Sequence, residues 1–201
     1  NLDLNPLTAT YIGREGYNDK LPNFLSPAHR KKQRQLEQTY LDKIDSIDID
    51  SLTEKQKISY QIFRQDRINA IAGFAFPSHL IPINQFYNLA NQYAMLGSGD
   101  SAQPFNDAED YANWAKRMHQ IPVIFDQAIA NMNEGVETGI VQPPVLIKKS
   151  ITQIRAQQVN DVKESIFWRP IDQFPDTLSE QQQEAFRTQY ANILNNEVIP
   201  A

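Results

Sequence analysis

The stretch that decides the fold runs from Ser26 to Gly73 and reads SPAHRKKQRQLEQTYLDKIDSIDIDSLTEKQKISYQIFRQDRINAIAG. It opens with an N-cap serine followed by proline at the first helical position, and apolar residues then recur at helical spacing as far as Ile47. The segment Thr53 to Gln56 has the form of a capping box and precedes a second periodic run with a broad apolar face. The pattern predicts two long helices, over about residues 27–46 and 53–73.

Helix signals continue beyond this stretch, separated by prolines and glycines. Pro122 either kinks the helix that precedes it or begins the next one. We expect an irregular segment 74–105 with a short helix near 84–95, followed by a helix capped by Asn106. Two further helices are expected, one over 121–138 that ends at Gly139 and one from Pro143-Pro144 to about Gln158. The segment 161–178 is expected to be broken by prolines but packed, and a last helix to run from the capping box at Ser179 nearly to the chain end.

No convincing strand, with apolar and polar residues in alternation between hairpin turns, is found in the sequence. We therefore predict an all-α fold, an irregular multi-helix bundle with long proline-broken connections, in which residues 1–201 form a single helical domain. Trp114 lies at helical spacing from Tyr111 and Met118, which favours a place in the core over a role in recognition.

Composition excludes several classes of function. The net charge is −5, which argues against nucleic-acid binding, and the chain has no cysteine for a disulfide, a thiol nucleophile or a Cys-ligated metal. No apolar run reaches the roughly 18 residues that a transmembrane helix needs. The first five residues, Asn1 to Asn5, do not form a signal peptide. The alternative that a leader was cleaved off ahead of Asn1 is left open.

Motifs for catalysis are also missing. His29, His79 and His119 are widely spaced and form no H-E-x-x-H pair, so we expect no catalytic residue and no metal site within this chain. Glycine-rich phosphate loops and a G-x-S-x-G nucleophile motif are not found either.

Charged clusters have plainer explanations than chemistry. The pairs Glu109 with Asp110 and Glu134 with Glu137 could serve as acid and base, but a solvated helix end explains them better. The basic cluster 30–34 is likewise interpreted as a solvated helix face.

The segment 74–87 is the best candidate for ligand contact, because it mixes aromatic rings with amide side chains in a proline-broken connection. Amide groups donate and accept hydrogen bonds and can pair with a peptide backbone. We take Asn84, Gln85, Phe86 and Tyr87 as candidate substrate-binding residues, with core or interface packing as the favoured alternative.

Several segments, read together, resemble the N-terminal half of the bacterial family called domain of unknown function 885. The matching segments are Pro6 to Thr10 with Gly13, Asp19 to Pro22 leading to Leu25-Ser26-Pro27, Pro82 to Gln85, Gln103-Pro104-Phe105 before Tyr111, and Asn133 to Gly135 continuing through Gly139 to Pro144. The resemblance implies a mostly helical fold related to zinc oligopeptidases and carboxypeptidases, in proteins nearly three times this length. It also implies that zinc is held in a C-terminal half that this sequence does not include.

On that basis the chain is expected to be an N-terminal portion that forms one wall of a peptidase substrate cleft, with the missing half or a second copy of the chain as partner and a peptide as substrate. The chain alone is not expected to be an enzyme. Relatives often carry export or lipoprotein leaders, which implies the cell envelope or periplasm. The alternative, which the residues favour without the resemblance, is a self-sufficient helical module that binds peptides or proteins or acts as a scaffold, without catalysis.

Overall fold

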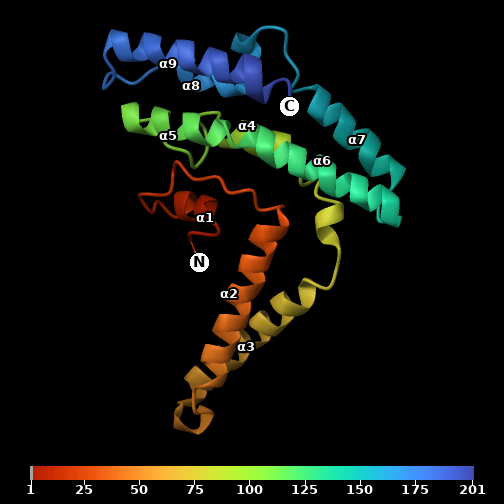
Figure 1. Ribbon diagram of the computed structural model, residues 1–201. Helices are drawn as coiled ribbons and strands as arrows, with labels where there is room; N and C mark the ends of the chain where they lie inside the picture. Colours follow the sequence, from red (N-terminus) through yellow and green to blue (C-terminus); the bar gives the residue numbers. More distant parts are fainter. Residues whose placement is uncertain (1) are drawn as a thin grey trace.

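The computed structural model describes residues 2–201, and every regular element within them is a helix (Figure 1). The all-α prediction is confirmed. Within the described part of the chain, no helix combines the length and the apolar composition needed to cross a bilayer. The α-helices are α1 (Pro6–Tyr11), α2 (Pro27–Asp45), α3 (Glu54–Gly73), α4 (Leu89–Leu96), α5 (Ala108–Met118), α6 (Ile121–Thr138), α7 (Pro144–Arg155), α8 (Arg169–Asp172) and α9 (Glu180–Ile193), with 3-10 turns at Ile49–Ser51, Ser78–Leu80, Val162–Glu164 and Ile166–Trp168 and a π-helical turn at Leu194–Val198.

The helices α2 and α3 form an antiparallel hairpin, the arm, which projects from the remaining helices (Figure 1). Two ion pairs join its helices: Arg64 Nε lies 2.6 Å from Asp45 Oδ1, and Arg67 Nη1 lies 2.9 Å from Glu37 Oε2. Both helices begin where the sequence predicts, because Ser26 and Thr53 cap them with their side chains.

The apolar face expected on α3 is not part of the core. All residues of α3 lie in the described part of the chain, and none of their side chains is buried. Ile58 and Ile62 are about 60% exposed. The physical reason is that the arm packs on itself, and two helices can cover only the sides that face each other.

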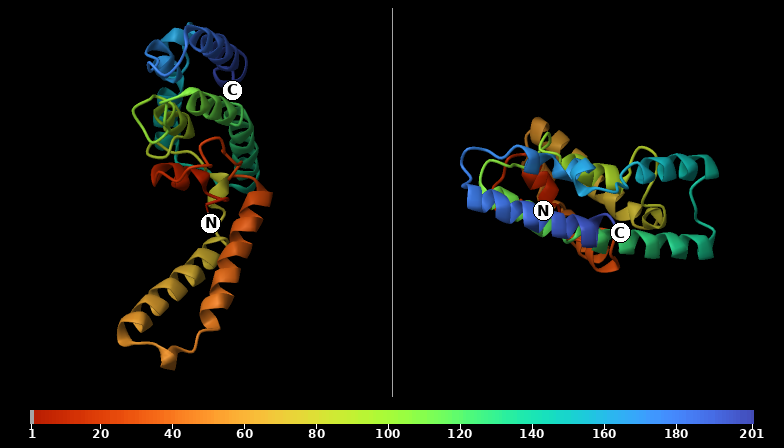
Figure 2. Two further views of the ribbon diagram at one scale, coloured as in Figure 1. Left: turned by 90° about the vertical axis from the view of Figure 1, so that its left-hand side faces the viewer. Right: turned by 90° about the horizontal axis from the view of Figure 1, so that it is seen from above.

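The remaining helices are stacked in tiers (Figure 2). The helices α8 and α9 form one outer tier, α4, α5 and α6 lie in the middle, and α1 lies on the other side. Aromatic rings fill the space between the outer and middle tiers: Tyr111 of α5 lies 5.1 Å from Phe174 and 5.3 Å from Phe186 between ring centroids. Trp114 is fully buried, which confirms its predicted place in the core.

The tier that contains α1 is attached through a buried arginine. Arg117 of α5 has no exposed surface, and its guanidinium donates to Lys20 O (3.1 Å), Tyr17 O (3.0 Å), Thr10 Oγ1 (2.7 Å) and Gln103 Oε1. Burial lowers the pKa of Arg117 to about 10, and the charge of Asp19 offsets part of that shift. One side chain therefore ties α5 to the N-terminal segment and to the loop that follows α4.

Three expected helix boundaries need correction, and one helix was not expected. The helix expected near 84–95 begins only at Leu89, because the Asn88 side chain caps it by accepting from Ala90 N. The cap of α5 is Asp107 and not Asn106, since the Asp107 carboxylate accepts from Asp110 N. The helix α7 ends at Arg155, a few residues early, and the sequence did not reveal α1.

Other boundaries agree with the sequence. Pro122 lies in the first turn of α6, which settles the alternative left open for it, and α6 ends at Gly139 in the left-handed conformation, with φ of +76°. The segment 161–178 forms no long helix, only two 3-10 turns and the four-residue α8, and it is packed, with Phe167, Trp168 and Ile171 buried. The capping box at Ser179 begins α9.

Replacing Arg117 by alanine is expected to destabilise the chain by about 3 kcal/mol or more, because it opens a buried space and leaves several buried acceptors unpaired. Chemical denaturation followed by circular dichroism measures the change. Lys116→Ala on the same helix is the control, since Lys116 is exposed, and it is expected to change the midpoint little. Equal midpoints for the two variants would contradict the role assigned to Arg117.

The buried phenol of Tyr111 leads to a prediction of how the free energy of unfolding depends on pH in the alkaline range. Its hydroxyl donates to Pro170 O over 2.8 Å, and burial, aided by the charge of Asp110, raises its pKa to about 12. The unfolded chain loses this proton near pH 10, so the stabilisation is complete below about pH 10 and is lost as the pH rises towards about 12. We expect Tyr111→Phe to cost about 1 kcal/mol at neutral pH and to flatten the fall in the unfolding midpoint between those pH values. A fall as steep as that of the unchanged chain would refute this assignment.

Candidate functional site

The segment between the arm and α4 places Phe86 on the surface, between two hollows. The α4 hollow, of about 350 Å³, is lined by Leu7, Tyr11, Gln85, Phe86, Asn88, Asn91, Gln92, Tyr93, Met95 and Leu96. The α7 hollow, of about 540 Å³, is lined by Gln85, Phe86, Lys149, Thr152 and Gln153. Phe86 is 79% exposed, so its ring stands between the two as an open apolar surface.

Local hydrogen bonds explain why this segment is not helical. The Asn84 side chain oxygen accepts from Phe86 N (2.8 Å) and from Tyr87 N (3.0 Å), while Asn84 N donates to Tyr87 O (3.1 Å). An asparagine that binds the backbone two and three residues later holds a tight turn. The turn directs the chain into α4 and leaves Phe86 and Tyr87 exposed.

A network of amide groups fastens this turn and α4 to α7. Gln153 Nε2 donates to Gln85 O (3.1 Å), and Gln153 Oε1 accepts from Asn88 Nδ2 (3.3 Å). Just beyond the end of α7, Gln157 Nε2 donates to Asn91 Oδ1 (3.1 Å). The two hollows are thus held in place by residues about 65 positions apart in the sequence.

The α4 hollow carries no charged side chain among the described residues that line it. Tyr93 is almost fully buried there, and burial raises its pKa well above the ordinary value, so the phenol stays neutral at physiological pH. Its hydroxyl has no hydrogen-bond partner within residues 2–201. The α7 hollow has one charged side chain in its lining, Lys149.

The four candidate residues from the sequence therefore take different positions. Gln85 and Phe86 line both hollows, whereas Asn84 shapes the turn through its side chain and Tyr87 is exposed outside both of them. The sequence missed the contributions of α1 and α7. The pair Lys149 and Gln153, four residues apart on one helix, was the available signal for α7.

The charged groups considered as catalytic candidates are not assembled into a reactive centre. Within the described residues, no group of three or more His, Asp or Glu side chains could hold a metal ion. Glu109 and Asp110 lie in the first turn of α5, where Asp110 accepts from Asn106 N, in keeping with a helix-end role.

The comparisons with known proteins place these features in a family context. The model of a family described as a bacterial protein of unknown function, DUF885, matches residues 6–201, which confirms the resemblance inferred from the sequence. A solved structure, described as a putative lipoprotein from Colwellia psychrerythraea, superposes with a TM-score of 0.83 at 15% identity, over 99% of this chain and 37% of that one. The chain thus spans little more than a third of this structural neighbour. No curated protein matches.

The amide network makes a prediction about local order. Replacing Gln153 by alanine removes the hydrogen bond that joins α7 to the turn at Gln85 and the one that joins α7 to the α4 cap at Asn88, so the backbone amides of Phe86 and Tyr87 are expected to exchange with deuterium at least several-fold faster. Hydrogen exchange followed by NMR measures the effect. Thr152→Ala, a neighbour that makes no contact to the turn through hydrogen bonds in the described structure, is the control. Unchanged exchange in Gln153→Ala would show that the turn is held by other contacts.

Proposed function

Because the chain belongs to the bacterial family of unknown function DUF885, we propose that it is the N-terminal helical part of a longer hydrolase and forms one wall of that protein's peptide-binding cleft. The observation that carries the proposal is the pair of hollows on either side of Phe86, lined mainly by amide and apolar side chains, with Lys149 and Thr152 added in the α7 hollow. The length of the structural neighbour supports a longer parent protein.

The chemistry of the lining suits an extended peptide. A peptide backbone offers both N–H donors and C=O acceptors, and an amide side chain can serve either of them. Asn91 and Gln92 of α4 lie beside Tyr11 and Met95, which offer apolar contact to peptide side chains. The lack of charge in the described lining of the α4 hollow favours uncharged, apolar segments, such as those that unfolded proteins expose.

The catalytic step of the proposed hydrolase is assigned to residues outside this chain. The described side chains do not fit a metal ion, so no step of zinc chemistry is placed on them. In this proposal zinc belongs to the C-terminal half of the parent protein, where it would supply a polarised water. The present chain contributes shape and binding contacts.

We also infer that the parent protein is located at the cell envelope and is exported by a lipoprotein leader that precedes this segment. The support is the description of the structural neighbour as a lipoprotein. Membrane fractionation of the native bacterial protein tests this, and recovery in the cytoplasmic fraction alone would reject it.

The peptide proposal predicts a specific loss of affinity. Titration with the uncharged peptide acetyl-Ala-Leu-Ala-Phe-Ala-amide, followed by calorimetry, is expected to show binding that Phe86→Ala weakens about fivefold or more, because an exposed aromatic ring provides a large share of such contacts. The control is Phe76→Ala, which removes an equally prominent ring, 68% exposed, from outside both hollows.

Two results would reject the proposal: failure of the unchanged chain to bind the peptide, or equal losses in Phe86→Ala and Phe76→Ala. Reading the coding sequence beyond Ala201 tests the parent protein separately. A downstream segment with a histidine and glutamate metal helix supports the hydrolase, whereas a stop codon there favours the self-sufficient binding module.

A further inference from the structure

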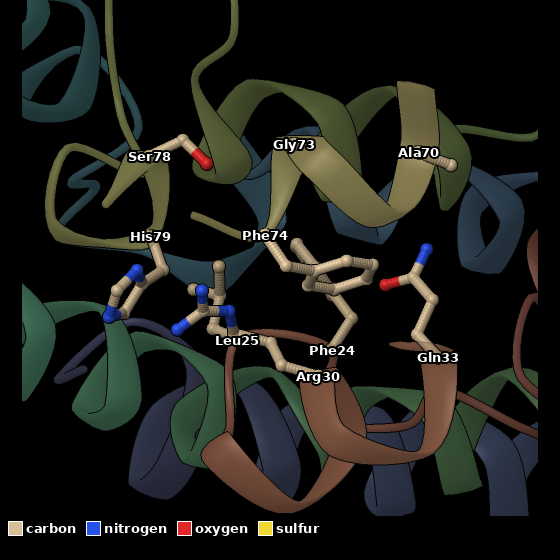
Figure 3. A pocket seen from close by; sticks show the side chains of 9 residues that line it. All are labelled: Phe24, Leu25, Arg30, Gln33, Ala70, Gly73, Phe74, Ser78 and His79. Atoms are coloured by element: carbon tan, nitrogen blue, oxygen red, sulfur yellow. The ribbon is translucent and has the colours of Figure 1, made fainter. Parts of the chain in front are cut away.

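A third hollow lies at the base of the arm, away from the two beside Phe86. It has a volume of about 250 Å³ and lies where the start of α2 meets the end of α3 and the turn Ser78–Leu80 (Figure 3). Its lining residues are Phe24, Leu25, Arg30, Gln33, Ala70, Gly73, Phe74, Ser78 and His79. Polar and apolar groups are thus combined in one small space.

The polar side chains that line this arm-base hollow have no partners among the described residues. In the part of the chain that the structure describes, no hydrogen bond or ion pair engages the side chains of Arg30, Gln33, Ser78 or His79. His79 Nδ1 is buried, although it has no hydrogen-bond partner among the described residues. Other arginines nearby differ, since Arg64 and Arg67 on the arm are both paired with carboxylates. A buried polar atom without a partner is uncommon in native proteins and calls for an explanation.

The electrostatics of the hollow favour an anion. Arg30 brings a guanidinium to the hollow, and no acidic side chain is among the described residues that line it. Burial and the charge of Arg30 lower the pKa of His79, and Glu134 raises it. Arg30 therefore acts on the imidazole as a nearby positive charge, and an anion bound between the two would favour the protonated imidazole.

The remaining lining is apolar and aromatic. Figure 3 shows the polar ends of Arg30 and His79 towards one side of the hollow and the ring of Phe74 towards the other. Phe24 and Leu25, from the segment that leads into α2, complete this apolar part. A small anion such as phosphate would leave the rings without a contact, whereas a carboxylate attached to an apolar group would use both parts.

We propose that the arm-base hollow binds a carboxylate that carries an apolar or aromatic group, with Arg30 as the main anion-binding residue, His79 as a second donor, and Phe24 and Phe74 around the apolar group. A guanidinium matches a carboxylate because it offers two parallel N–H donors. Such a ligand could be the C-terminal residue of a peptide or a free organic acid. The proposal does not rest on the peptide wall beside Phe86.

The test uses the 201-residue chain and a matched pair of probes, N-acetyl-phenylalanine and N-acetyl-phenylalaninamide, which differ in the carboxylate alone. Calorimetry or NMR titration is expected to show that the acid binds at least about tenfold more tightly than the amide, since a charge-assisted bond is replaced by a neutral one. 3-Phenylpropionate then separates the two sources. If 3-phenylpropionate binds as tightly as N-acetyl-phenylalanine, the natural ligand is a free organic acid. If 3-phenylpropionate binds much more weakly, the natural ligand is a peptide C-terminus.

Variants on α2 assign the effect to the hollow. Arg30→Gln is expected to weaken binding of N-acetyl-phenylalanine about tenfold or more, and Arg30→Lys, which keeps the charge without the fork, to weaken it less. Arg34→Gln is the control, because Arg34 lies one turn further on, is exposed and does not line the hollow. Circular dichroism melting shows that each variant is folded. Absence of binding, equal affinity for acid and amide, or equal losses in Arg30→Gln and Arg34→Gln would each overturn the proposal.

Discussion

The arrangement of the tiers depends on one buried cation. Arg117 lies in the middle tier, and its guanidinium is shared among a side chain of α1, two backbone carbonyls that follow α1, and an amide in the loop after α4. All four partners are neutral, so the charge is stabilised by hydrogen bonds and by Asp19 at longer range, without a direct carboxylate partner. Segments that lack regular structure are thereby held against a rigid helix, and the short α1 gains a fixed position.

The same principle, polar groups that join distant segments, governs the surface beside Phe86. There the joining groups are amides, and they connect α7 to α4 and to the turn before it. Charged side chains would stabilise such a junction less, because the desolvation of each buried charge must be offset by an opposite charge and by hydrogen bonds. Neutral amides leave the α4 hollow uncharged and the ring of Phe86 open, a combination that suits the peptide-binding wall proposed for this surface.

The arm presents a different physical situation. Its helices are paired with each other through Arg64 with Asp45 and Arg67 with Glu37, and its apolar residues Ile58 and Ile62 are left exposed. At its base, by contrast, the side chains of Arg30 and His79 line a hollow without a hydrogen-bond or ion-pair partner among the described residues. The hollow there joins the arm to the tiers, so a ligand bound in it would contact both α2 and the turn that leads towards α4.

Local chemistry in the sequence was sufficient to predict most of the helices. Capping residues such as Ser26, Thr53 and Ser179 act within four residues of themselves, and so do the prolines and Gly139. The resemblance to a family, read from scattered segments, was confirmed by the family comparison. Gln85 and Phe86 were named as candidates from the composition of their segment, the hollows that they line were not foreseen, and their role in binding stays a prediction.

Tertiary structure alone decided which apolar residues are buried and which polar groups meet. The periodicity of α3 does not reveal that Ile58 and Ile62 lack a covering helix, and a single arginine in α5 does not reveal that three of its partners lie about 100 residues earlier. The hollows depend in the same way on contacts between segments far apart in the chain. Spacing along a chain reports local backbone geometry, whereas burial and long-range hydrogen bonds depend on how the helices pack.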